Sequence, residues 1–279
     1  MKLIRFKDLD RYYDRVKEHL LDCEAANCLL LAHALASCRH DELYAVAVED
    51  RDRIIATAIH VPPRKLLISR SSNLLAVEAI ARDFVAGGRS VVGMTSSQAE
   101  AEAFVAVWQD LTNNPVELEV SMQVHQLKTG TAGEIDPAVG ELRLATEAET
   151  ELLTQWVRQF AKEALGVDES IAESRGWVTR NIEQNSLYVW QYGDSMVSMT
   201  ACGGKTPNGI RIKSVYTPPQ DRGKGFATSL VTAISQHLLK QNKYCFLFTD
   251  TANPISNRIY RKIGYVPMAD ISDYNFYFC

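Results

Sequence analysis

The chain has 279 residues, of which 46% are hydrophobic and 23% are charged, so its composition excludes a disordered, collagen-like or membrane-embedded protein. Lys and Arg number 30 against 34 Asp and Glu, a formal net charge of -4, so we expect neither a nucleic acid nor a membrane as a partner. At about 100 to 200 residues per domain, the length favours two domains over one large unit.

The chain begins MKLIRFKDLD, a charged stretch without the apolar segment of a secretory signal peptide. The longest uncharged apolar stretch, around Leu29 to Leu35, is much shorter than the roughly 20 residues that cross a membrane. We therefore expect a cytoplasmic protein whose six cysteines are reduced thiols. Cys23, Cys28, His33 and Cys38 recur every five residues, but on a helix this spacing turns successive side chains by about 140°, so no metal site is predicted.

The first part of the chain, residues 1–127, is predicted to form one domain. It begins with a long helical region over residues 7–38. Hydrophobic periodicity and turn residues then predict three strands, a helix, a strand, a helix and a last strand. Their ranges are 42–49, 53–60, 65–69, 73–86, 90–94, 96–112 and 116–127.

Residues 128–140 interrupt this pattern with three glycines and a proline, which predicts a linker. A second domain, residues 141–279, is predicted to hold a strand, two helices, three strands, a helix, a strand, a helix and a closing hairpin. The ranges before the hairpin are 141–145, 148–165, 168–184, 187–193, 195–203, 209–217, 223–240, 243–249 and 254–263. The two halves repeat nearly the same order of elements, which favours a duplicated architecture.

A glycine turn joins the predicted strand 209–217 to the helix that follows. Gly223 and Gly225 allow positive φ and a close approach of a ligand to the backbone, and the helix start presents unpaired N–H groups. Such a turn binds phosphate, and Arg222 and Lys224 add positive charge. The alternative is that the glycines only form a tight turn. The spacing matches neither a GxGxxG dinucleotide site nor a P-loop, so any phosphate belongs to another ligand.

Two motifs in this half carry a resemblance. Gln220 to Gly225 reads Q-D-R-G-K-G, and Asn253 to Tyr265 reads N-P-I-S-N-R-I-Y-R-K-I-G-Y. They resemble the motifs Q/R-x-x-G-x-G/A and N-x-x-A-x-x-x-Y-x-K-x-G-F/Y of the GNAT superfamily, the acetyl-coenzyme-A-dependent N-acyltransferases. The resemblance covers about residues 141–279. It implies an α/β (α+β) fold of two tandem GNAT-like domains, each a mixed, mostly antiparallel sheet flanked by helices.

The first half departs from the family's pattern. In its equivalent strand-to-helix turn, Leu67 to Asn73, there is no glycine, so this half is expected to be a degenerate GNAT-like domain.

The predicted helix 254–263 of the second half has two stripes of side chains. Ile255, Ile259 and Ile263 are expected to face the sheet, while a neighbouring polar stripe is free to face a ligand. That polar stripe consists of Asn253, Asn257 and Tyr260.

The resemblance implies transfer of an acetyl or acyl group from acetyl-coenzyme A to a primary amine by direct attack, without a metal. Tyr260 would be the general acid for the coenzyme A thiolate. The remaining implied contacts are with coenzyme A. They are Val215, Tyr216 and Thr217 along the pantetheine arm, Gln220, Asp221, Arg222, Gly223, Lys224, Gly225, Phe226 and Ala227 around the pyrophosphate, and Asn253 and Asn257 on the arm.

The general base is not assigned by the resemblance, because the strand 209–217 contains no carboxylate. Asp250, just past the next strand, is the nearest candidate, and its alternative role is to cap the turn into the Asn253 helix. Glu169 and Glu173 are further candidates for recognising a cationic acceptor. The tryptophans Trp156, Trp177 and Trp190 either line an apolar acceptor site or pack in the core.

Two rival functions remain open at this stage. One is a non-catalytic acyl-coenzyme A sensor or interaction module, and the other is a phosphate-ligand protein that holds a nucleotide. The acceptor amine, small molecule or protein, is not identified by the sequence, and either a monomer or a homodimer is compatible with it.

Overall fold

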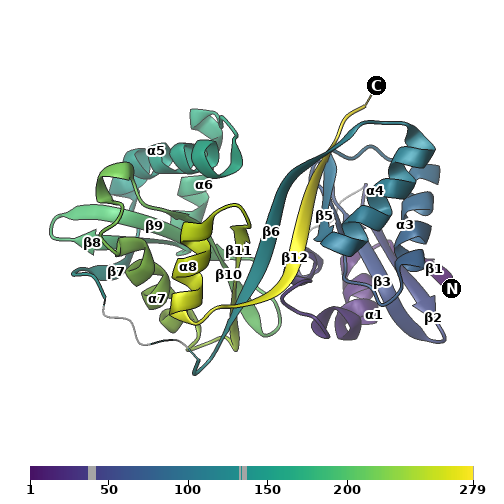
Figure 1. Ribbon diagram of the computed structural model, residues 1–279, viewed down its shortest axis with the longest axis horizontal. Helices are drawn as coiled ribbons and strands as arrows, with labels where there is room; N and C mark the ends of the chain where they lie inside the picture. Colours follow the sequence, from purple (N-terminus) through teal and green to yellow (C-terminus); the bar gives the residue numbers. More distant parts are fainter. Residues whose placement is uncertain (37–41, 132, 134–136, 279) are drawn as a thin grey trace.

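In the described part of the chain, a mixed sheet of twelve strands joins both halves of the molecule, with helices on both of its faces (Figure 1). The computed structural model describes residues 1–36, 42–131, 133 and 137–278. No helix in these ranges is long and apolar enough to span a membrane. The predicted fold class, a mixed and mostly antiparallel sheet flanked by helices, is confirmed.

The first half follows the predicted order of elements, with one correction. The expected helical region 7–38 is two helices, because Asn27 stabilises a turn between them: it donates to Leu20 O of the first helix and accepts from the distant Arg70 N. The elements are β1 (Lys2–Arg5), α1 (Leu9–Leu21), α2 (Cys28–Ala34), β2 (Tyr44–Asp50), β3 (Arg53–His60), β4 (Leu66–Ile68), α3 (Leu74–Ala86), β5 (Gly93–Ser97), α4 (Gln98–Thr112) and β6 (Val116–Lys128).

The second half also follows the predicted order, except at its end. The expected closing hairpin is wrong, because β12 is one long strand that is paired on both of its edges. The elements are β7 (Glu141–Leu144), α5 (Thr150–Phe160), a π-helical turn (Ala161–Leu165), α6 (Ile171–Glu183), β8 (Leu187–Tyr192), β9 (Ser195–Gly203), β10 (Gly209–Tyr216), α7 (Phe226–Leu238), β11 (Tyr244–Asp250), α8 (Pro254–Ile263) and β12 (Val266–Phe276).

The two halves exchange their last strands. The sheet order is β1-β2-β3-β4-β5-β12-β6-β11-β10-β9-β8-β7, so β12 lies beside β5 of the first half and β6 lies beside β11 of the second. Both pairings are antiparallel, and β6 and β12 also pair with each other. In Figure 1 these two strands run side by side between the halves. Each half is therefore completed by a strand from the other.

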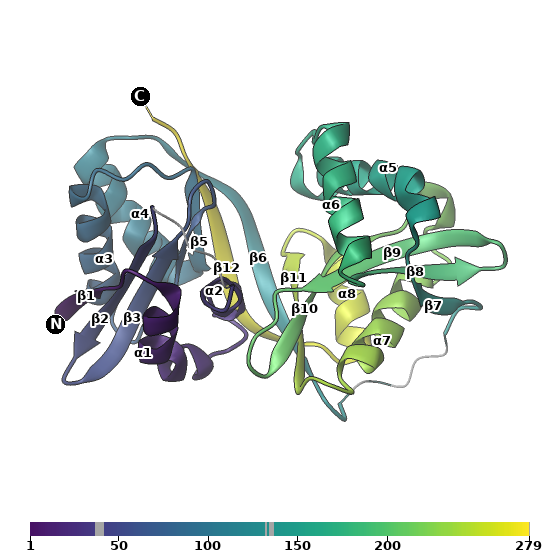
Figure 2. The same cartoon turned by 180° about the vertical axis from the view of Figure 1, so that it is seen from behind.

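A buried carboxylate adds a second connection between the halves. Glu24, only 7% exposed, lies in the turn between α1 and α2. It accepts hydrogen bonds from Thr206 Oγ1 at 2.5 Å and from the backbone and side-chain amides of Asn208, both at 2.9 Å. Beside it, Ala25 and Cys28 pack in a cluster with Phe246 of β11. These contacts hold α2 over the middle of the sheet, where Figure 2 shows it in front of β6 and β12.

Candidate functional site

The parallel strands β10 and β11 separate after a short paired stretch. Only Gly209 to Arg211 lie opposite residues of β11. Beyond them β10 contains a bulge between Lys213 and Tyr216, with Ser214 at a φ of 53°. Among the described residues, the edge of β10 that faces β11 thus has no strand partner over its second half, and its backbone groups are available to a ligand.

The glycine turn follows directly on this open edge. Gly223 has a φ of 77° and Gly225, the N-cap of α7, has a φ of 83°. A Cβ atom added at Gly223 would have no neighbour within 4 Å in the described part of the chain. Since no crowding selects glycine there, the positive φ selects it, and the space beside the backbone is open. Phe226 anchors the start of α7 in an apolar cluster with Trp190 and Leu230.

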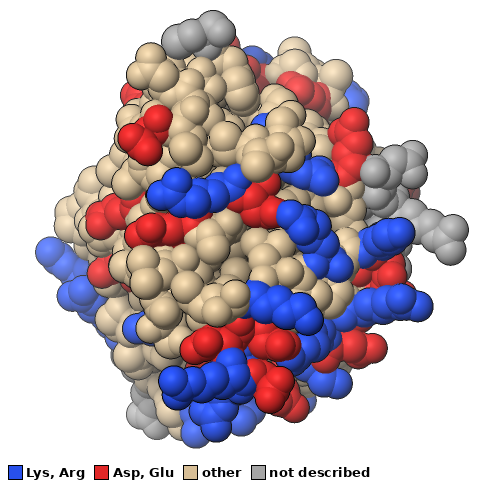
Figure 3. All heavy atoms as spheres, turned by 90° about the vertical axis from the view of Figure 1, so that its right-hand side faces the viewer, with Lys and Arg blue, Asp and Glu red and all other residues tan. Residues whose placement is uncertain are grey.

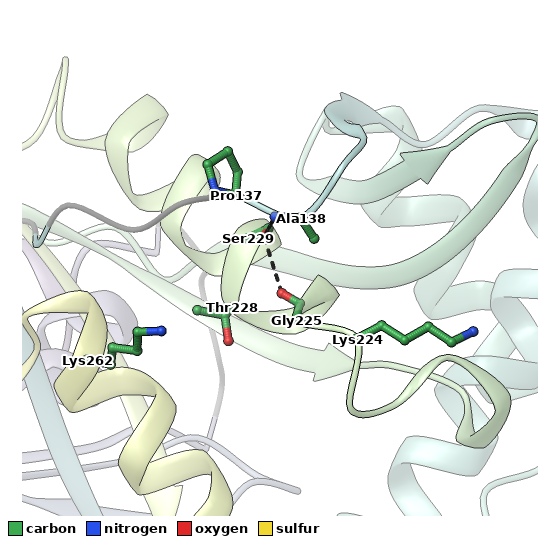
Figure 4. A pocket seen from close by; sticks show the side chains of 7 residues that line it. All are labelled: Pro137, Ala138, Lys224, Gly225, Thr228, Ser229 and Lys262. Atoms are coloured by element: carbon green, nitrogen blue, oxygen red, sulfur yellow. Dashed lines mark hydrogen bonds between the residues drawn. The ribbon is translucent and has the colours of Figure 1, made fainter.

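A pocket of about 210 Å³ lies against the first turn of α7 (Figure 4). Lys224 borders it and donates to Asp221 Oδ1 at 2.9 Å. Lys262 reaches it from α8 and has no ion pair within the described ranges. Two cations and the N-terminus of a helix make this pocket favourable for phosphate. Its lining consists of Pro137, Ala138, Lys224, Gly225, Thr228, Ser229 and Lys262.

The sequence alone did not single out Lys262, Thr228 or Ser229. The signal for Lys262 was present, because it is the lysine of the motif that contains Tyr260. For Ser229 there was none, since its contact comes from a distant segment: Ser229 Oγ accepts from the backbone N–H of Ala138 at 2.7 Å.

Arg222 takes part in a different set of contacts from Lys224. Its Nε donates to Thr217 O at 2.9 Å, and its terminal nitrogen donates to Glu163 Oε2 at 2.5 Å. The Tyr216 hydroxyl donates to Gln159 Oε1 at 2.8 Å. Arg222 therefore braces the glycine turn against the end of α5 and the π-helical turn. Glu163, which closes this contact, was not predicted from the sequence.

Tyr260 lies in the apolar core between α8 and the sheet. It is 8% exposed and packs with Ile263 and Tyr265. Its hydroxyl has no hydrogen-bond partner in the described part of the chain, and burial raises the pKa of the phenol to about 12. The phenol is therefore protonated at neutral pH and has a proton to donate.

The expected orientation of α8 needs correction. Ile255 is 72% exposed, so it does not face the sheet, while Tyr260 and Ile263 are buried. The helix is turned because Asn257 is tied to β11: its Oδ1 accepts from Thr249 Oγ1 at 2.6 Å and its Nδ2 donates to Asp250 O at 3.3 Å.

The other polar candidates around α8 make local hydrogen bonds. Asn253 Oδ1 accepts from Ser256 N at 3.1 Å and caps the helix. Asp250 Oδ1 accepts from Ala252 N at 2.7 Å, which is the capping role considered for it. These contacts leave Asn253 Nδ2 and Asp250 Oδ2 without a partner among the residues described. The ligand roles of these residues stay predictions.

Glu169 and Glu173, the candidates for recognising a cationic acceptor, also make local hydrogen bonds. Glu173 forms a capping box with Ser170 at the start of α6, and Glu169 Oε2 accepts from Ser174 Oγ at 2.7 Å. Trp156 and Trp190 are buried core residues, whereas Trp177 is half-buried. No cluster of three metal-ligating side chains occurs among the described residues. Cys38, the last member of the five-residue pattern, lies outside them.

The comparisons with known proteins agree with this geometry. Residues 195–271 match the family profile of FR47-like proteins. The chain is 14% identical to an acetyltransferase of the GNAT family from Colwellia psychrerythraea, with a TM-score of 0.61 over 99% of this chain and 100% of that one. It is 14% identical to a GCN5-related N-acetyltransferase from Sphaerobacter thermophilus, with a TM-score of 0.62 over 98% and 95% of the two chains.

The duplicated arrangement also has a counterpart. A tandem GNAT protein from the clavulanic acid biosynthesis pathway is 11% identical, with a TM-score of 0.53 over 99% of this chain and 98% of that one. None of the curated proteins matches the chain. The chain thus has the fold of these solved GNAT acetyltransferases, in a tandem arrangement, as the resemblance of the two motifs implied. The family profile covers both motifs.

Proposed function

We propose that the second half of this chain is an N-acetyltransferase domain that moves the acetyl group of acetyl-coenzyme A to a primary amine, and that the first half is a degenerate domain of the same fold. One observation carries the proposal. The open edge of β10 leads directly into a turn with two glycines at positive φ and then into a pocket with two lysines at a helix N-terminus. Acetyl-coenzyme A is a thioester on a long arm that ends in phosphate groups. The arm would contact the open edge, and the phosphate groups would contact the turn and the pocket.

The residues divide between binding and chemistry. The pyrophosphate of acetyl-coenzyme A would be held by the turn from Gln220 to Ala227, with Lys224 and Lys262 supplying positive charge. The pantetheine arm would pair with the backbone of Val215 to Thr217 in place of the missing strand partner. Its binding would place the thioester beside the bulge of β10, where backbone N–H groups polarise the carbonyl.

The remaining proposed roles concern proton transfer. An alkyl ammonium has a pKa of about 10.4, so the acceptor must lose a proton before it attacks the thioester. Asp250 is the candidate base, acting through its Oδ2. Tyr260 would donate its proton to the departing thiolate, since it lies on α8 with its hydroxyl otherwise unpartnered among the described residues.

Three measurements test the proposal against its rivals. We expect acetyl-coenzyme A, and neither ATP nor NAD, to raise the melting temperature, because a ligand that binds only the folded state stabilises it by mass action. We also expect thiol release with at least one member of a panel of primary amines. Binding without release would favour a non-catalytic sensor, and stabilisation by ATP or NAD alone would favour a nucleotide-binding protein.

A further inference from the structure

Two cations lie side by side on β10, outside the contacts assigned above. Arg211 and Lys213 are two residues apart on one strand, so their side chains leave the same face of the sheet. Both are only partly exposed. Neither forms an ion pair or hydrogen bond in the described ranges, and Arg211 Nε is fully buried with no partner. Positive charge held out of water without a counterion is costly, so the site is incomplete as it stands.

The neighbours of the two cations are aromatic or cationic. Lys213 Nζ lies 5.6 Å from the ring centre of Trp177, and Arg211 Cζ lies 5.9 Å from the ring centre of Phe248. Burial, and then the charges of Arg64 and Arg211, lower the pKa of His33 to about 4, so the field of Arg211 reaches α2. Burial, and then Arg211, also lower the pKa of Lys213.

The nearby carboxylate of Glu24 is already hydrogen-bonded within the protein. Glu24, which like Arg211 influences the thiol of Cys28, gives both of its oxygens to Thr206 and Asn208. No other acidic side chain among the described residues pairs with either cation. Among the described residues, the two cations therefore have no balancing anion, which an anionic ligand would supply.

Arg211 and Lys213 lie on the face of the sheet from which an acceptor would approach. Ile212 packs in the cluster formed with α7 and α8, so Arg211 and Lys213 leave the opposite face of the sheet, toward α6 and α2. The phosphate pocket and Tyr260 lie on the α7 and α8 side. An acceptor would approach the open edge of β10 from the face that the coenzyme leaves free, and Lys213 directly precedes the bulge.

Resting on the proposed N-acetyltransferase function, we propose that Arg211 and Lys213 form the acceptor's anion subsite, so that the substrate is an amine that also carries a carboxylate or a phosphate. The aromatic rings of Trp177 and Phe248 flank this subsite. The same charges repel polyamines and aminoglycosides, whose additional groups are cationic.

The experiment compares matched acceptors that differ only in the anionic group. The pairs are β-alanine with β-alaninamide and 2-aminoethyl phosphate with ethanolamine, each assayed by thiol release. We expect the wild-type protein to prefer at least one anionic member by about tenfold or more in kcat/KM. Arg211→Gln and Lys213→Gln should each reduce that preference about tenfold, whereas Lys213→Arg should retain most of it. Lys240→Gln, at an exposed lysine after α7, is the matched control.

A second measurement keeps the subsite testable when no amine is turned over. Propionate and ethyl phosphate, which lack the amine, are titrated by calorimetry into the wild type, Arg211→Gln and Lys213→Gln, with acetyl-coenzyme A affinity as the check on folding. Binding of either anion that is lost in both variants, without turnover of any amine, supports the subsite and contradicts the proposed activity. Turnover without an anionic preference, or equal anion binding by wild type and variants, overturns the subsite.

Discussion

The carboxylate of Glu100 accepts a hydrogen bond from the backbone N–H of Ser71, at 2.7 Å, in the loop that leads from β4 into α3. This loop is the first half's counterpart of the glycine turn, since each follows the first strand of a parallel pair and precedes a helix. Here Glu100 is 4% exposed, and the N–H groups of Arg70 and Leu75 are bonded to Asn27 and Asn73. The first half thus uses its own side chains, whereas the N–H groups of Gly223 to Gly225 in the second half have no partner among the described residues.

We predict from this contrast that each chain binds one molecule of acetyl-coenzyme A. Titration calorimetry should give a stoichiometry near one for the wild type. Glu100→Gln should give the same stoichiometry with a lower melting temperature, because the substitution weakens a buried hydrogen bond to a charged acceptor without creating a glycine turn. A stoichiometry near two in either protein would contradict the assignment of the first half as degenerate.

Tyr260→Phe removes the proposed proton donor while keeping the ring in its apolar site. We expect kcat to fall about tenfold to a thousandfold, with little change in the dissociation constant for acetyl-coenzyme A. Steady-state kinetics and calorimetry on the same preparations separate the two effects. Tyr265→Phe is the matched control, because this neighbouring tyrosine is also buried but donates to or accepts from Ser235 at 2.8 Å. An unchanged kcat in Tyr260→Phe would remove Tyr260 from the mechanism.

The raised pKa of Tyr260 also predicts a stability effect at alkaline pH. In the folded protein the phenol has a pKa of about 12, against about 10 in the unfolded chain. Its contribution to stability is fully present below pH 10 and is lost as the pH rises through 12, because the unfolded state gives up the proton first. Denaturant melts at pH 9 and 11 should therefore show a smaller loss of stability in Tyr260→Phe than in the wild type. Equal losses would mean that burial does not perturb this phenol.

Local patterns predicted much of the fold, and the errors have a common cause. The bounds of β9 and α8 agree with the sequence-based ranges, and the glycine turn lies where its motif placed it. Ile255 was assigned to the sheet face because periodicity defines a stripe but not its rotation, which the contacts of Asn257 with β11 determine. The exchange of β6 and β12 was not predicted, because alternating residues specify a strand and not its neighbours.

Substitution of Lys262 tests the phosphate pocket without changing a residue that is proposed to transfer a proton. Its substitution by Gln removes a cation at the N-terminus of α7 and keeps a polar side chain of similar length. We expect the dissociation constant for acetyl-coenzyme A to rise about threefold to tenfold and its dependence on salt to weaken, since an exposed charge contributes modestly and is screened. Lys240→Gln should leave both quantities unchanged. Equal affinities for Lys262→Gln and wild type would exclude Lys262 from the binding site.

The strand exchange predicts that the second half does not fold alone, although it carries both motifs. A chain of residues 141–279 lacks β6, so the whole of β11 loses a partner, and β12 loses both of its partners, β5 and β6. Unpaired edges of this length promote aggregation. The cluster under α7 and α8 also loses Leu127, a buried residue contributed by β6.

We therefore expect residues 141–279 alone to be insoluble or aggregated in size-exclusion chromatography. Co-expression with residues 1–140 should restore a soluble complex that binds acetyl-coenzyme A, because the cut falls between β6 and β7 and divides neither strand. A co-expressed first fragment that ends before β6, residues 1–114, is the matched control and should not restore it. If residues 141–279 alone are soluble and bind acetyl-coenzyme A as tightly as the full chain, the exchanged strands are dispensable and the two halves fold independently.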